Sequence, residues 1–164
     1  SGVKTVTVTN ASAVSPATLS ALKTAAGSSA ANLRADTRTK NGVFVGRMTV
    51  NPTTVTTKDN IALGIEIDNQ YTKATEAFFA KWFKNDIQIV GVTHSGSFGG
   101  TVRVTAKLTL QNYDKDNLVF YIYDRATNKY SRLENPDYFI DSNGFIHFTI
   151  DRGGDVVISN GVLA

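Results

Sequence analysis

Two histidines, His94 and His147, are the only side chains of this sequence that titrate near neutral pH, so acid–base chemistry would have to involve them. His147 lies inside a predicted strand (GFIHFTI) and has no evident partner. His94 is followed by Ser95 and Ser97, but the run is not a Gly-x-Ser-x-Gly elbow, and no acid is placed to orient the imidazole. Two histidines so far apart give little support to a metal site. The sequence therefore predicts a protein that is not an enzyme.

Carboxylates are the second set of groups with chemical potential, since paired carboxylates hydrolyse glycosides in many enzymes. In the second half of the chain, each Asp is predicted to occupy a turn, where its side chain accepts backbone hydrogen bonds. Glu66 and Glu76 are predicted to face solvent on a strand and a helix. The runs 114–117 and 141–144 resemble parts of calcium loops but lack the closing Glu. We therefore expect no catalytic carboxylate pair, no metal site and no cofactor.

Tyrosines are the remaining candidates, because sugar rings can lay their apolar C–H surfaces against aromatic faces. The candidate carbohydrate-binding residues are Tyr71, Tyr121, Tyr123 and Tyr130. A ring that stacks on a ligand has to be exposed, so this hypothesis requires accessible tyrosines. The alternative is that these rings fill the core or its margins and bring only their hydroxyls to the surface.

Trp82 is the single tryptophan, and its spacing favours a structural role. It lies four residues after Phe78 in a helix predicted from about residue 73 to 84, and Phe79 and Phe83 have the same spacing. We expect this helix to dock its aromatic face on a sheet and to bury Trp82.

Strands must position these residues, because most of the chain alternates apolar and polar side chains. Strands are predicted at 3–9, 43–50, 61–67, 86–92 and 101–110 and, repeatedly, between 118 and 159, with a glycine-rich turn at 94–100. A first helix is predicted to open at Ser15-Pro16 and to end at Gly27. The pattern predicts a mainly β protein, an antiparallel β-sandwich of immunoglobulin-like plan with two short helices.

Length and composition bound the partners. The 164 residues suit one domain, and we expect a single module over residues 1–164, with Ser1 and Gly2 as an artificial start. The net charge of +3 is scattered along the chain, so nucleic acid is not an expected partner. No cysteine is present, which excludes disulfides. No apolar run approaches the roughly 20 residues that span a bilayer, so membrane insertion is not expected.

The closing segments carry a resemblance to a known group of proteins. Residues 121–124 (YIYD), 143–149 (NGFIHFT) and 154–159 (GDVVIS) resemble the last strands of accessory β-sandwich modules. These modules occur in secreted surface and dockerin-bearing proteins of Ruminococcus-type gut anaerobes. The earlier runs VSPATLSALKTAAG and AFFAKWFKNDIQIVGV are similar to the same modules.

The resemblance implies a secreted or cell-surface protein associated with a cellulosome or amylosome. Its expected partners are a polysaccharide, such as starch or a plant glycan, and neighbouring domains of the parent protein. Related modules serve as spacers, adhesion units or polysaccharide-binding units. We therefore expect a non-catalytic module that assists polysaccharide binding, with a structural spacer or a protein-interaction module as the alternative.

Overall fold

The computed structural model describes residues 2–164, so Ser1 of the expected artificial start lies outside the described residues. The strands are β1 (Val3–Thr9), β2 (Ala13–Val14), β3 (Ala30–Arg38), β4 (Phe44–Val50), β5 (Ile61–Ala62), β6 (Ile65–Glu66), β7 (Ile87–Lys107), β8 (Val119–Asp124), β9 (Lys129–Arg132), β10 (Tyr138–Ile140) and β11 (Phe145–Ser159). The helices are α1 (Pro16–Ala26) and α2 (Gln70–Trp82). The prediction of a mainly β protein with two short helices is confirmed.

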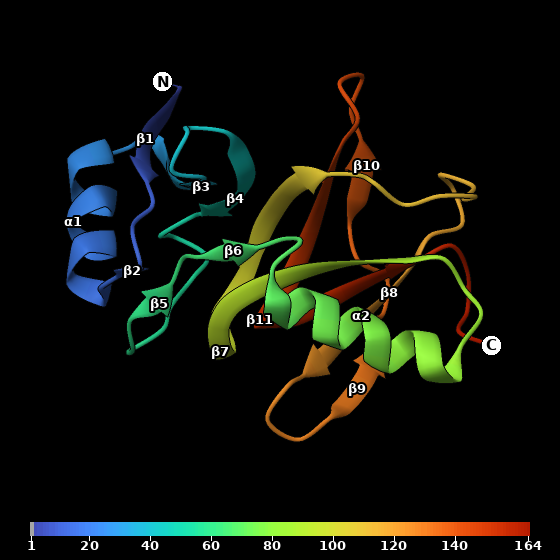
Figure 1. Ribbon diagram of the computed structural model, residues 1–164. Helices are drawn as coiled ribbons and strands as arrows, with labels where there is room; N and C mark the ends of the chain where they lie inside the picture. The colour runs from blue at the N-terminus through green and yellow to red at the C-terminus, as the bar shows by residue number, and fades with distance from the viewer. Residues whose placement is uncertain (1) are drawn as a thin grey trace.

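Two long strands, β7 and β11, form the centre of the sheet and pair in antiparallel fashion (Figure 1). Their register shifts on both sides of the pair Arg152–Ser97, where both strands bend. The strands approach closely there, since a Cβ on Gly153 would overlap the carbonyl oxygen of His94. The predicted turn at 94–100 is wrong, because this glycine-rich segment continues β7 beside the bend of β11.

The bend divides the sheet into two parts. In the first part, the strands lie side by side in the order β1, β3, β4 and the second half of β7. Strand β10 pairs with the first half of β11 in the same part. In the second part, β6 flanks the first half of β7, and β8 and β9 follow the second half of β11. Phe148 from the first part and Phe120 from the second meet at 5.4 Å between ring centroids, in one core. Alternation of side chains buries one face of each part in this core.

The sheet is mixed, which differs from the predicted antiparallel plan. β1 pairs with β3 in parallel, with Val3 opposite Ala30. The reason is that α1 lies between them in sequence, and a parallel pair needs such a crossover. An immunoglobulin-like sandwich is not confirmed, since the main sheet follows one hydrogen-bonded order, β1-β3-β4-β7-β11-β8-β9, and the second sheet consists of the short strands β2 and β5 alone.

The local signals of α1 are confirmed. The hydroxyl of Ser15 accepts a hydrogen bond from the backbone N–H of Thr18 at 3.1 Å, and Pro16 is the first helical residue. Gly27 ends the helix with a φ of 61°, a left-handed value that glycine adopts without a Cβ penalty. Leu19 fixes the helix to the main core.

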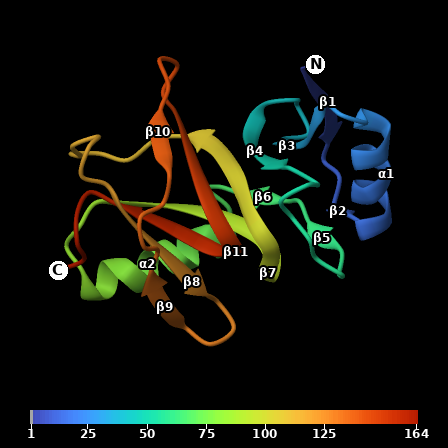
Figure 2. The ribbon, with the colours of Figure 1, turned by 180° about the vertical axis from the view of Figure 1, so that it is seen from behind.

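Helix α2 covers the second part of the sheet, in front of β8 and β9 in Figure 1 and behind them in Figure 2. Phe79 is fully buried there and packs with Ile89, Tyr123 and Val157. The predicted burial of Trp82 is wrong, because its side chain is 66% exposed. Trp82 is the last residue of α2, and Phe83 leaves the helix in an extended conformation and packs on Phe79 instead.

Within residues 2–164, neither α1 nor α2 has the length and apolar character needed to cross a membrane.

Candidate functional site

Two of the candidate tyrosines line one surface hollow, which we call the tyrosine hollow. Its volume is about 770 Å³, and Tyr123 and Tyr130 form part of its wall. Tyr71 lies at its rim, with the ring centroid 5.3 Å from the guanidinium carbon of Arg125, a lining residue. Tyr121 is not part of the hollow: it is buried beside α2, and its hydroxyl accepts a hydrogen bond from the N–H of Leu163.

Exposure separates the four tyrosines into two pairs. Tyr71 is 52% exposed and Tyr130 is 42% exposed, so both rings can contact a ligand. Tyr121 and Tyr123 are buried, contrary to the exposure that sugar stacking requires. The physical reason is that residues 121 and 123 alternate onto the face that α2 covers, where both rings join its aromatic cluster.

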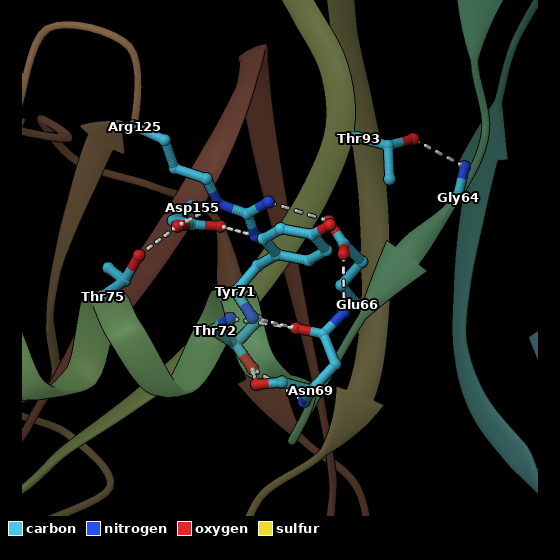
Figure 3. Close-up of polar contacts among 9 residues, drawn as sticks. All are labelled: Gly64, Glu66, Asn69, Tyr71, Thr72, Thr75, Thr93, Arg125 and Asp155. Atoms are coloured by element: carbon cyan, nitrogen blue, oxygen red, sulfur yellow. Dashed lines mark hydrogen bonds and ion pairs between the residues drawn. The ribbon is translucent and has the colours of Figure 1, made fainter.

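An ion-pair network of Arg125, Asp155 and Glu66 lines part of the hollow, and Figure 3 shows its contacts. Arg125 donates to both carboxylate oxygens of Asp155, from Nε and from Nη2, at 2.8 Å each. Its Nη1 donates to Oε1 of Glu66 at 3.1 Å. Asp155 is only 1% exposed, and the bidentate contact with Arg125 compensates the cost of burying this carboxylate.

The start of α2 is tied to the same network. The hydroxyl of Thr75 donates to Oδ2 of Asp155 at 2.6 Å. The amide of Asn69, which caps α2, donates to Oε2 of Glu66. Figure 3 shows the ring of Tyr71 over the guanidinium group of Arg125. The network therefore joins α2, β6, β11 and the turn between β8 and β9 around one guanidinium group.

A missing side chain makes room for this guanidinium group. Gly91 on β7 lies opposite Asp155 on β11. A Cβ at Gly91 would lie 3.0 Å from both Nη2 of Arg125 and Oδ1 of Asp155, and 3.1 Å from Cβ of Glu66. A larger residue at position 91 would press on the ion pair, so glycine leaves the space that the guanidinium group of Arg125 occupies beside β7.

The pKa values of Arg125 and Tyr123 are both raised, which fixes the charge state of these two groups in the hollow. The hydrogen bond to Asp155 raises the pKa of Arg125 above its ordinary value, although burial acts in the opposite direction. Burial raises the pKa of the Tyr123 hydroxyl, and the carboxylates of Asp155 and Asp124 raise it further. This hydroxyl stays neutral and donates to Oδ1 of Asn128 at 2.6 Å. The hollow thus holds a permanent cation and fixed polar groups, and neither of these two groups releases a proton near neutral pH.

The remaining wall offers hydrogen-bond donors and acceptors, some on short side chains and some at the ends of long side chains. It contains Asp124, Thr127, Lys129, Ser131 and Arg152. Such a mixture matches hydroxyl groups, because each hydroxyl both donates and accepts.

His94 has a structural role. It is 7% exposed and stacks on Phe98 with the ring centroids 4.5 Å apart. Its Nδ1 accepts from the N–H of Ala62 at 3.1 Å, so Nε2 carries the proton and donates to the carbonyl of Ser97 at 3.0 Å. Both ring nitrogens are occupied, and the imidazole links β5 to the bend of β7.

His147 has partners that sequence reasoning missed. Its Nδ1 lies 2.9 Å from the hydroxyl of Thr105, and its Nε2 lies 2.9 Å from Oδ2 of Asp141. Its ring stacks on Phe139 at 4.4 Å. The sequence does not show these partners, because Thr105 lies opposite His147 only through the pairing of β7 with β11. That register cannot be read from either strand alone.

The prediction that each Asp of the second half serves a turn holds for some positions and fails for others. Asp124 accepts from the N–H of Ala126 at 2.8 Å, as a turn residue does. Asp155 instead lies inside β11 and pairs with Arg125. An acid within the apolar run GDVVIS was the available sign of a buried ion pair.

Among residues 2–164, no group of three His, Asp or Glu side chains is placed to hold a metal ion. Comparison of the chain with protein-family models, curated proteins and solved structures gives no match.

Proposed function

We propose that this protein is a non-catalytic module that helps to hold a polysaccharide, with starch or a plant glycan as the ligand. The observation that carries the proposal is the tyrosine hollow, in which Tyr130 is 42% exposed beside charged and hydroxyl side chains in a space of about 770 Å³. Ligand sites of this size combine an apolar surface with a few fixed polar groups.

The binding mode follows from the groups that line the hollow. The exposed ring of Tyr130 offers an apolar surface for a sugar ring, and it is held edge-on by Phe79 at 5.1 Å and by Phe83 at 6.0 Å. Arg125, already fixed by Asp155, offers an ordered cation in the lining of the hollow. Pre-ordered groups lose little conformational entropy on binding, so less of the free energy gained from contacts with a glycan is lost to ordering the site.

The cellular setting belongs to the same proposal and rests on the resemblance of the closing strands. We place the module in a secreted or cell-surface protein of a Ruminococcus-type anaerobe, in a cellulosome or an amylosome. In this proposal, the two parts of the bent sheet correspond to the two layers of the accessory β-sandwich.

A second candidate function is protein interaction or spacing between neighbouring domains. The observation that favours it is β1, whose hydrogen-bonded neighbour in the described sheet is β3 alone and whose residues are nearly all exposed. Such an edge can accept a strand from another domain.

The experiment is a pull-down of the purified protein on insoluble starch, cellulose and xylan. We expect retention on at least one of them and a reduced bound fraction for Tyr130→Ala. Tyr113→Ala is the matched control, since Tyr113 is 38% exposed and does not line the hollow. No retention on any of the three polymers would remove polysaccharide binding, and equal losses in both variants would move the site away from Tyr130.

A further inference from the structure

The open face of the first part of the sheet carries arginines in register. Arg34 on β3 lies opposite Thr49 on β4, Thr49 lies opposite Arg103 on β7, and Arg103 lies opposite Thr149 on β11. Neighbouring strands are about 4.8 Å apart, so the backbones of Arg34 and Arg103 are separated by about 10 Å. Arginines and threonines therefore alternate across four strands on one face.

These residues surround a second hollow, which we call the arginine hollow. Its volume is about 400 Å³, and Arg34, Arg47 and Arg103 line it together with Thr49, Thr105 and Thr149. No acidic side chain forms part of its lining. Asp36 and Asp137 lie at the border, where they pair with Arg47 and Arg103.

Part of the positive charge has no internal partner. Arg34 is exposed and forms no ion pair with any of residues 2–164. Arg103 donates from Nη2 to Asp137 at 3.0 Å, but its Nη1 is buried and has no hydrogen-bond partner. The Arg103 side chain as a whole is 32% exposed, so the accessible part of its guanidinium group can donate to an oxyanion in the hollow.

The chemistry of the ligand follows from these groups. Guanidinium forks bind oxyanions such as carboxylates through paired N–H donors. The threonine hydroxyls and the amides of Asn32 and Asn51, which also line the hollow, suit sugar hydroxyls. Nucleic acid fits less well, because no Phe, Tyr or Trp among residues 2–164 lines the hollow to stack on a base.

We infer that the arginine hollow is a second binding site, for an acidic polysaccharide whose sugars carry carboxylate groups. Arg34 and Arg103 bind the carboxylates, and the threonine hydroxyls between them bind ring hydroxyls. This site shares β7 and β11 with the tyrosine hollow but is lined by other residues, and it does not depend on a neutral glycan binding there.

The test is affinity electrophoresis of the full chain in native gels that contain polygalacturonate. Fully methyl-esterified polygalacturonate is the matched ligand, since it keeps the sugar backbone and lacks the charge. We expect retardation by the acid form alone, a decrease in retardation as salt is added, and about tenfold or greater weakening in Arg34→Ala and in Arg103→Ala.

Arg132→Ala is the control variant, because Arg132 is exposed on β9 outside the hollow. Arg34→Lys should recover only part of the affinity, because a lysine keeps the charge but lacks the fork. The inference is overturned by absence of retardation, by equal retardation in both polymers, or by equal weakening in Arg132→Ala. Stronger Arg34-dependent retardation by polydeoxythymidylate would also overturn it, in favour of a nucleic-acid site. Tyr130→Ala should leave polygalacturonate binding unchanged, whatever its effect on starch.

Discussion

Replacement of Phe79 and replacement of Trp82, both on α2, should differ greatly in their effect on stability. Phe79 is fully buried between α2 and the sheet, whereas Trp82, three residues later, is 66% exposed. Phe79 also meets the rings of Phe78, Tyr123 and Tyr130 at 5.1–5.4 Å in edge-to-face geometry. Phe79→Ala removes a whole ring from a closed core, while Trp82→Ala removes a ring that mostly contacts solvent.

The magnitudes follow from burial. Loss of a buried Phe costs about 3–5 kcal/mol, and in a chain of this size each kcal/mol lowers the melting temperature by roughly 2–4 °C. We therefore expect Phe79→Ala to lower the melting temperature by about 6–20 °C. Trp82→Ala should change the free energy of unfolding by no more than about 0.5 kcal/mol. Both changes introduce alanine into the same helix, so the gain in helix propensity is similar and cancels in the comparison.

Scanning calorimetry and far-ultraviolet circular dichroism measure both variants. Because Trp82 is the single tryptophan, acrylamide quenching of its fluorescence in the native protein gives an independent check. The native state should be quenched almost as strongly as the urea-unfolded state. A protected native tryptophan, or a Trp82→Ala variant as unstable as Phe79→Ala, would refute the packing of α2 described above.

Three further predictions concern the polar networks. Asp155→Asn should lower the free energy of unfolding by about 2–3 kcal/mol in a urea titration, because it removes the bidentate carboxylate partner of Arg125 and leaves only Glu66 to compensate that cation. This loss of stability is limited because the Arg125 side chain is 36% exposed, so solvent screens part of its charge. Asp151→Asn is the control: Asp151 is 62% exposed in its ion pair with Arg152, so its replacement should cost under about 0.5 kcal/mol. Gly91→Val should destabilise by about 1–3 kcal/mol because its side chain displaces the ion pair, and unchanged stability would contradict the close approach described above. The hydrogen bond from His147 holds the pKa of Asp141 below its ordinary value of 3.8, so the stabilisation by Asp141 is present above that pH and is lost as the pH falls through the lowered pKa. Thermal melts from pH 5 to 2 should show a smaller acid-induced loss in Asp141→Asn, and identical profiles would count against this coupling.

Local patterns in the sequence predicted the elements whose causes are local. Alternation in 101–110 predicted a strand, and β7 covers this segment as far as Lys107. The first helix was predictable because Ser15, Pro16 and Gly27 act within one turn of the chain. These features need no knowledge of the partner strand.

The position of Trp82 shows where periodicity stops being informative. Helical spacing places residue 82 on the same side as Thr75 and Phe79, both of which are buried. Periodicity gives the direction of a side chain but not the point at which the covered sheet ends. Phe83, in extended backbone, takes the inner place beside Tyr130.

The candidate sites depended on contacts between distant parts of the chain. Arg125 contacts Asp155, thirty residues later, and Glu66, fifty-nine residues earlier. Neither pair lies within one helix or strand, so the periodicity of a single element could not predict these contacts. The arginine row needs the register of four strands, which is set by the bends and shifts of β7 and β11. Such contacts are products of topology, so the sequence supplied the side chains without their neighbours.

Both candidate sites depend on the bend of β7 and β11. Before the bend, β7 contributes Gly91 to the network of Arg125, and after it the same strand contributes Arg103 to the arginine hollow. The close approach of Gly153 to His94 holds the two parts at a fixed relation, since any side chain at residue 153 would separate the strands. The sheet therefore gives one face to the helix and its tyrosines and leaves another open to solvent, which allows a small module to present two surfaces of different chemistry.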